Sequence, residues 1–177
     1  MEDTYLTERL VLTKFSLADI EDLSAMFEDQ ELNVTSGLKL PTSNPERILA
    51  LTMLSKTPSS VVYILRDKQA KTVVGLVVFY RMYLVDYQYS NRECEIGFVL
   101  RRESRQQGLM SEALTQLIVA YFDETKFTVL YAGAHTNNLA SKAVLKRMKF
   151  EPCELPNNLN ENQFNLELDY FCLLQPK

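Results

Sequence analysis

The residues best suited to chemistry lie in one stretch, 93–108, where an alternating segment runs into a basic turn. Apolar and polar side chains alternate along 93–100, which predicts a β-strand with one buried face. The apolar face consists of Cys94, Ile96, Phe98 and Leu100. The other face is expected to carry two carboxylates, Glu93 and Glu95.

The turn after this strand is basic and leads into a predicted helix. Arg101, Arg102 and Arg105 precede Gly108, after which apolar residues recur at three- and four-residue spacing. The first turn of a helix has unpaired N–H groups and the positive end of the macrodipole, so it favours an anion. Glycine lets a ligand approach the backbone, and arginines add the charge that suits a pyrophosphate. A solvated basic turn is the alternative that these residues leave open.

Several segments resemble, in order along the chain, the motifs of one family. The loop Arg105-Gln106-Gln107-Gly108-Leu109-Met110 resembles the pyrophosphate loop of the GNAT superfamily of acetyl-CoA-dependent N-acetyltransferases. Its branch of ribosomal-protein N-terminal (Rim-type) acetyltransferases has strands and helices similar to residues 7–12, 95–98, 111–114, 138–141, 144–150 and 168–174. The resemblance therefore covers nearly the whole chain.

This resemblance implies a GNAT-like fold, acetyl-CoA as the acetyl donor, and a set of contacts to it. In that fold two parallel strands, here 93–100 and 127–132, separate, and the donor lies in the gap. The backbone of Phe98, Val99 and Leu100 is then expected to pair with the pantetheine amides, and the loop 105–110 to bind the pyrophosphate. Asn138 resembles a residue that hydrogen-bonds the donor, and Ser141 resembles a serine implicated in catalysis.

Two positions depart from the family pattern. Met110 stands where the family usually has a small residue, and Lys149 stands where it usually has glycine. Met110 lies on the apolar stripe of the predicted helix, so we expect its side chain in the core. Lys149 follows a helix end, where a left-handed conformation would be comfortable only for glycine.

The resemblance also places the acyl carbonyl near Gly97 and Glu95. An amine must be neutral to attack a thioester, so a base is needed. Glu95, or Glu93 on the same face, is expected to accept the proton through water; surface carboxylates at a strand end are the alternative. His135, the single histidine, could relay a proton, and a structural role is its alternative. Many GNAT enzymes use a tyrosine as the acid, but the matching residue is Leu145, so Ser141 is the expected group that assists the thiolate.

Amino-acid composition argues against several classes of protein. The 177 residues carry a net charge of −4 with a pI near 5.1, which argues against nucleic-acid binding. Three cysteines without metal-ligand spacing, together with one histidine, suggest neither a disulfide framework nor a metal site. With no apolar run of membrane-spanning length and no signal-peptide pattern, we expect a cytoplasmic protein. One domain is expected over 1–177.

The remaining periodicity predicts a mixed α/β fold, mostly antiparallel, with helices on both faces of the sheet. We expect further strands at 9–15, 61–66, 72–80 and 164–174, and helices at 16–29, 43–55, 108–121 and 138–148. Residues 31–40 are expected to form a loop or an irregular helix, and residues 82–92 a loop.

The predicted function is acetyl transfer from acetyl-CoA to a primary amine, by direct attack in a ternary complex. No cysteine lies in the matched motifs, so no acyl-enzyme is implied. A non-catalytic CoA-binding or regulatory module on the same fold is the alternative. The acceptor, a protein N-terminus or a small amine, stays open, as does a homodimer. By resemblance, 37–47 would select the acceptor; Tyr83, Tyr87 and Tyr89 either bind the amine or cover the sheet.

Overall fold

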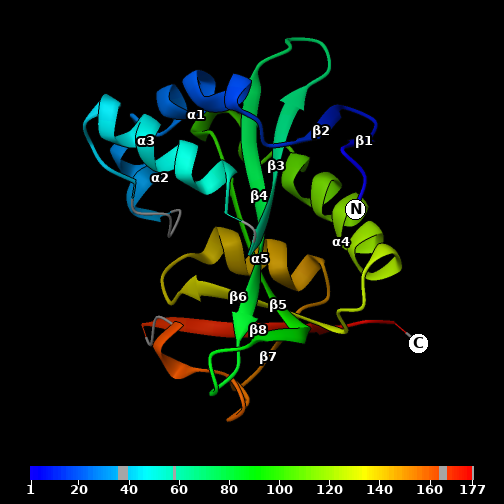
Figure 1. Ribbon diagram of the computed structural model, residues 1–177. Helices are drawn as coiled ribbons and strands as arrows, with labels where there is room; N and C mark the ends of the chain where they lie inside the picture. Colours follow the sequence, from blue (N-terminus) through cyan, green and yellow to red (C-terminus); the bar gives the residue numbers. More distant parts are fainter. Residues whose placement is uncertain (36–39, 58, 164–166, 177) are drawn as a thin grey trace.

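The computed structural model describes residues 1–35, 40–57, 59–163 and 167–176 (Figure 1). Within these residues the strands form one eight-stranded sheet in the order β1-β2-β3-β4-β5-β6-β8-β7. Every neighbouring pair is antiparallel except β5 and β6, which are parallel and joined through a helix. The strands are β1 Thr4–Leu6, β2 Leu10–Lys14, β3 Ser60–Asp67, β4 Val73–Tyr83, β5 Tyr89–Leu100, β6 Val129–His135, β7 Glu151–Pro152 and β8 Leu168–Leu174.

Helices cover both faces of this sheet, because the central strands bury side chains on both sides. One core contains α1 (Ile20–Met26), α2 (Gln30–Thr35) and α3 (Asn44–Ser55), which pack against β3, β4 and Val99 of β5. The other contains α4 (Leu109–Glu124) and α5 (Leu139–Arg147). The predicted mixed, mostly antiparallel α/β fold is therefore confirmed.

Helix α4 is fixed by its apolar stripe. Met110, Leu114 and Leu117 are buried against the sheet, and the ring of Tyr121 stacks on Phe79 of β4 with centroids 4.3 Å apart. Met110 thus points into the core, as its place in the stripe predicted.

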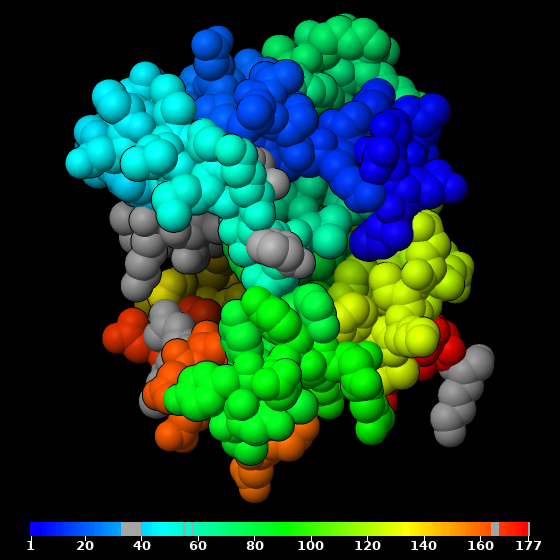
Figure 2. All heavy atoms as spheres, in the orientation of Figure 1, coloured from blue at the N-terminus to red at the C-terminus, as the bar shows by residue number. Residues whose placement is uncertain are grey.

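The N-terminal segment lies beside the far end of α4. The α-amino group of Met1 forms an ion pair with Glu124 at 3.1 Å, and the Tyr5 hydroxyl donates to the same carboxylate at 2.6 Å. Figure 2 shows this segment (dark blue) against α4 (yellow-green). The edge strand β1 is thereby tied to the helix that begins at the basic turn.

Helix α5 ends in a left-handed residue, as the sequence indicated. Lys149 has φ 63°; its N–H donates to Lys146 and that of Phe150 donates to Leu145. These two bonds form a Schellman motif, in which glycine is the preferred residue at the left-handed position. Lys149 therefore holds a conformation that is strained for a residue with a Cβ.

Several predicted boundaries are wrong. The loop expected at 82–92 is mostly strand, because β4 and β5 continue as one long hairpin past a register shift at residues 81–83. Tyr83 and Tyr89 pair across it, with their hydroxyls 2.7 Å apart and Arg81 over the Tyr89 ring. Strand β6 lies at 129–135 instead of 127–132. Residues 30–35 form α2, in line with the helical alternative for 31–40, of which residues 36–39 lie outside the described residues. The helix expected over 16–29 is a 3₁₀ turn, Leu17–Asp19, followed by α1, and residues 164–166 of the last predicted strand lie outside the described residues.

In the part of the chain that the structure describes, no helix is both long and apolar enough to cross a lipid bilayer.

Candidate active site

Strands β5 and β6 separate at the centre of the sheet (Figure 1). Their parallel pairing ends at Glu95 and Tyr131, after which β5 stays paired with β4 and β6 stays paired with β8. The structure therefore contains the fork between 93–100 and the following parallel strand that the resemblance implied.

One edge of β5 beyond the fork has no neighbouring strand among the described residues. The Arg101 amide donates to the Val74 carbonyl of β4 at 2.8 Å, which fixes which residues face β4. Since backbone direction alternates, Val99 faces β4, whereas Phe98 and Leu100 direct their N–H and C=O groups into the fork. Two of the three residues expected to offer backbone groups to pantetheine are thus turned toward the gap.

Glu95 lies at the vertex of this fork, half-buried on the face that α1–α3 cover. Directly opposite on β4 is Tyr80, and within the described residues the Glu95 carboxylate has no hydrogen-bond partner. Burial raises the pKa of Glu95 to about 7. Burial, and then the charge of Glu95, raise the pKa of Tyr80, which stays protonated. A carboxyl group with this pKa can take up a proton near neutral pH.

The carboxylate of Glu93, the other predicted candidate for the base, already has a hydrogen-bond donor within the chain. The buried Ser90 hydroxyl donates to its carboxylate and accepts the amides of Arg92 and Glu93 at 3.0 Å each. Because this carboxylate already has a close donor, Glu95 is the better placed of the two to receive a proton from a ligand.

The basic turn enters α4 through two residues with positive φ. Gln106 has φ 63° and Gly108, the N-cap residue, has φ 78°. Gln106, Gln107 and Gly108 are exposed, whereas Leu109 and Met110 are buried and anchor the helix. The predicted loop thus presents bare backbone at the start of a 16-residue helix. That arrangement suits an anion such as a diphosphate.

Two arginines of the turn, which the sequence suggested would be available to a pyrophosphate, already have partners within the protein. Arg105 donates through Nε to the Leu100 carbonyl at 3.3 Å and through Nη1 to Glu31 of α2 at 3.2 Å. Arg102 also approaches Glu31, at 3.6 Å. The carboxylate of Glu31 therefore offsets part of the positive charge that two arginines bring to the loop.

On the other side of the fork, β6 leads into α5. Asn138 caps α5, since its Oδ1 accepts the Ser141 amide at 3.0 Å. The Ser141 hydroxyl is partly exposed and makes no hydrogen bond to any described residue. His135 ends β6, and its carbonyl accepts the amide of Asn138. The capping role considered for Asn138 is thus present, and its side-chain N–H₂ group has no hydrogen-bond partner among the described residues.

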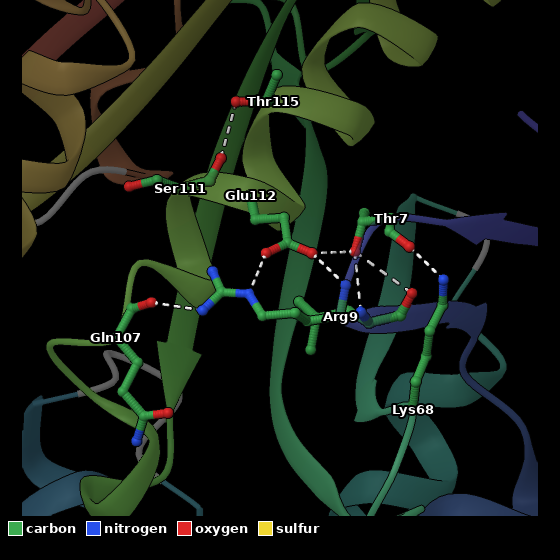
Figure 3. A network of polar contacts seen from close by, with 8 residues as sticks. Thr7, Arg9, Lys68, Gln107, Ser111, Glu112 and Thr115 are labelled. Carbon is green, nitrogen blue, oxygen red and sulfur yellow. Dashed lines mark hydrogen bonds and ion pairs between the residues drawn. The ribbon is translucent and has the colours of Figure 1, made fainter.

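Sequence reasoning missed the network on the β2 side of the turn. Arg9 donates to the Gln107 carbonyl at 2.8 Å and to Glu112 in the first turn of α4 at 2.7 Å, and Thr7 donates to the same carboxylate (Figure 3). Arg9 and Glu112 are 103 positions apart. No periodicity spans that separation, so no local signal could have paired them.

The model of the acetyltransferase (GNAT) domain family matches residues 9–151. The chain belongs to this family. Acetyl-CoA is the acetyl donor of GNAT enzymes. The exposed loop backbone fits its diphosphate, and the edge of β5 that has no neighbouring strand among the described residues fits its amide groups.

Individual GNAT relatives are distant in sequence. The N-acetyltransferase YoaA of Bacillus subtilis (strain 168), whose function is uncharacterised, is 23% identical over 148 residues, which cover 82% of this chain and 81% of YoaA. A GNAT acetyltransferase from Bacillus anthracis superposes with a TM-score of 0.74 at 18% identity, covering 97% of this chain and 98% of the other. The ribosomal-protein acetyltransferase RimL, solved with coenzyme A, gives 0.70 at 16% identity, with 96% of each chain covered.

Proposed function

We propose that this protein transfers the acetyl group of acetyl-CoA to a primary amine by direct attack in a ternary complex. The observation that carries the proposal is the position of Glu95, a half-buried carboxyl group without a partner among the described residues, at the vertex of the β5–β6 fork. Acetyl-CoA would supply the acetyl thioester.

Glu95 is proposed as the general base. An ammonium group must lose a proton before it can attack, and a base works best when its pKa is near the working pH. Because burial raises the pKa of Glu95 to about 7, the carboxylate binds a proton more firmly than an exposed glutamate would. Water can carry the proton between the amine and this carboxylate.

The donor would be held by the elements on either side of the fork. Phe98 and Leu100, with Val99 between them, would offer backbone groups to pantetheine. The exposed backbone of the loop, from Arg105 through Gln106, Gln107 and Gly108 to Leu109 and Met110, would bind the diphosphate. Asn138 would donate its remaining N–H groups.

Ser141 is proposed to assist the leaving thiolate. Its hydroxyl has no partner among the described residues and lies in the first turn of α5, where the N–H groups also favour a negative charge. A covalent intermediate is not needed. Cys94, the cysteine nearest to Glu95 in sequence, is fully buried, and burial raises the pKa of its thiol to about 12.

The acceptor would be a protein N-terminus or a small amine. A homodimer and a cytoplasmic location stay predictions.

The test compares turnover with binding. Glu95→Gln and Ser141→Ala should each leave acetyl-CoA affinity nearly unchanged and lower kcat about a hundredfold, the size of general acid–base assistance. Glu93→Gln is the matched control and should keep most activity. If Glu93→Gln loses turnover and Glu95→Gln keeps it, the base assignment is wrong. If no amine is acetylated although acetyl-CoA binds, the protein is a CoA-binding module instead.

A further inference from the structure

Arg9 lies between the exposed loop and the carboxylate of Glu112 (Figure 3). Nη1 of Arg9 donates to the Gln107 carbonyl at 2.8 Å, and Nε donates to Oε2 of Glu112 at 2.7 Å. Nη2 lies 3.6 Å from the point that a Cβ at Gly108 would occupy. The guanidinium group therefore stands directly beside the two residues whose backbone opens α4.

Glu112 is a charge that an anionic ligand would meet at this helix end. It lies in the first turn of α4, where a carboxylate favours the helix but repels an anion bound to the same turn. Burial alone would raise the pKa of Glu112, but hydrogen bonds from Thr7 and Arg9 outweigh it and hold the pKa below its usual value. The carboxylate is therefore ionised at neutral pH.

The other charges near the loop nearly cancel. Glu31 offsets Arg102 and Arg105, and Glu103 lies 3.9 Å from Arg101. With Glu112 included, three turn arginines face three carboxylates. Two arginines from other parts of the chain leave the loop with a net positive charge. One is Arg9, and the other is Arg147, whose Nη1 donates to the Ser111 hydroxyl in the first turn of α4 at 2.9 Å.

We infer that Arg9 positions the acyl donor. Its guanidinium group cancels the charge of Glu112 and holds the Gln107 carbonyl, so that the first N–H groups of α4 can donate hydrogen bonds to the phosphates of acetyl-CoA. This inference rests on the proposed function and adds a residue that no loop motif contains. Arg9 acts indirectly. Its hydrogen bond to Gln107 holds the loop backbone in place, and its ion pair with Glu112 removes a negative charge from the first turn of α4.

Removing Arg9 and removing Glu112, the two partners of one ion pair, should have opposite effects on acetyl-CoA binding. In calorimetric titrations with acetyl-CoA, Arg9→Gln should weaken binding by about tenfold or more, because Glu112 is left unneutralised. Glu112→Gln should bind acetyl-CoA as tightly as the wild type or a few times more tightly. The double variant should lie closer to the wild type than Arg9→Gln does, and Arg9→Lys should recover part of the loss. Raising the salt concentration should shrink the difference.

An acetyl donor without phosphates tests whether Arg9 acts on the phosphates of acetyl-CoA. With S-acetyl-pantetheine as donor, Arg9→Gln should leave kcat/KM close to the wild-type value, while with acetyl-CoA the loss should appear in KM. Arg66→Gln is the matched control: Arg66 lies on β3 and pairs with Asp19 at 2.6 Å and Asp22 at 2.9 Å, on α1 and the turn before it. Its loss should lower stability without changing acetyl-CoA affinity.

The binding results separate a role of Arg9 in donor binding from a role in the fold alone. If Arg9→Gln and Glu112→Gln weaken binding equally, or if both donors are affected alike, Arg9 only supports the fold and the inference is wrong. If the wild type binds acetyl-CoA and Arg9→Gln binds it equally well, the inference alone fails. If the wild type does not bind acetyl-CoA, the proposed function fails first and the inference with it.

Discussion

Replacement of Glu95 by glutamine should stabilise the protein above pH 7 while removing its proposed base. The pKa of Glu95 is raised from an ordinary 4.5 to about 7, so the folded state prefers the protonated carboxyl group. A raised pKa gives stability that is fully present below pH 4.5 and is lost as the pH rises through about 7. Glutamine resembles the protonated form at every pH, and thus avoids this loss.

The size of the effect follows from the two pKa values. At about 1.4 kcal/mol per pH unit, the rise from 4.5 to about 7 corresponds to about 3 kcal/mol. Because Glu95 is only half-buried, solvent screens part of this cost, and we expect a gain of about 2 kcal/mol at pH 8.5. For a chain of this size that gain is an increase in Tm of about 4–8 °C.

Urea unfolding of both proteins at pH 4.5 and pH 8.5 measures this gain. The two curves should nearly coincide at pH 4.5 and separate at pH 8.5, with Glu95→Gln the more stable. Glu112→Gln provides a control of opposite sign: the pKa of Glu112 is lowered, so its removal should cost stability at pH 8.5 and little at pH 3. A Glu95→Gln gain of the same size at both pH values would refute the burial argument.

Other substitutions test the remaining parts of the structure. Lys149→Gly should raise the free energy of unfolding by about 1 kcal/mol because it relieves the positive φ, and Lys149→Ala should bring no gain; a gain in both would trace the effect to the lysine charge. Gly108→Asp should weaken acetyl-CoA binding by about 2 kcal/mol, by adding a carboxylate beside the loop, and circular dichroism should show the fold retained; unchanged affinity would place the phosphates elsewhere. Gly75→Ala should cost about 3 kcal/mol in chemical denaturation, because the new Cβ would lie 2.3 Å from the Val99 carbonyl oxygen, while Gly97→Ala, whose nearest neighbour lies at 3.1 Å, should cost less.

The parts of the fold that depend on local patterns could be predicted from the sequence. The apolar stripe of α4 placed Met110 in the core, and the helix end before Phe150 placed Lys149 in a left-handed conformation. Strand alternation put Glu95 on the face opposite to Cys94 and Ile96. These features depend on residues only a few positions apart, so the local sequence pattern is enough to predict them.

Features that depend on tertiary contact could not be predicted. The extension of the β4–β5 hairpin relies on a register shift and on the Tyr83–Tyr89 pair, in a segment that is polar enough to resemble a loop. Which residues of β5 face the fork depends on the register with β4. The partner of Arg105 is Glu31, 74 positions away. Ion pairs between residues far apart in the chain cannot be recognised from a single sequence.

The most direct test of the central claim is the identification of the product. Wild-type protein is incubated with acetyl-CoA and a panel of primary amines across pH 6–9; thiol release is followed, and the amines are analysed by mass spectrometry. We expect thiol release that requires an amine, the added mass of one acetyl group on that amine, and a rate that rises with pH through about 7, where Glu95 loses its proton. Thiol release without an acetylated amine, or an absence of transfer to every amine in the presence of bound acetyl-CoA, would contradict the account.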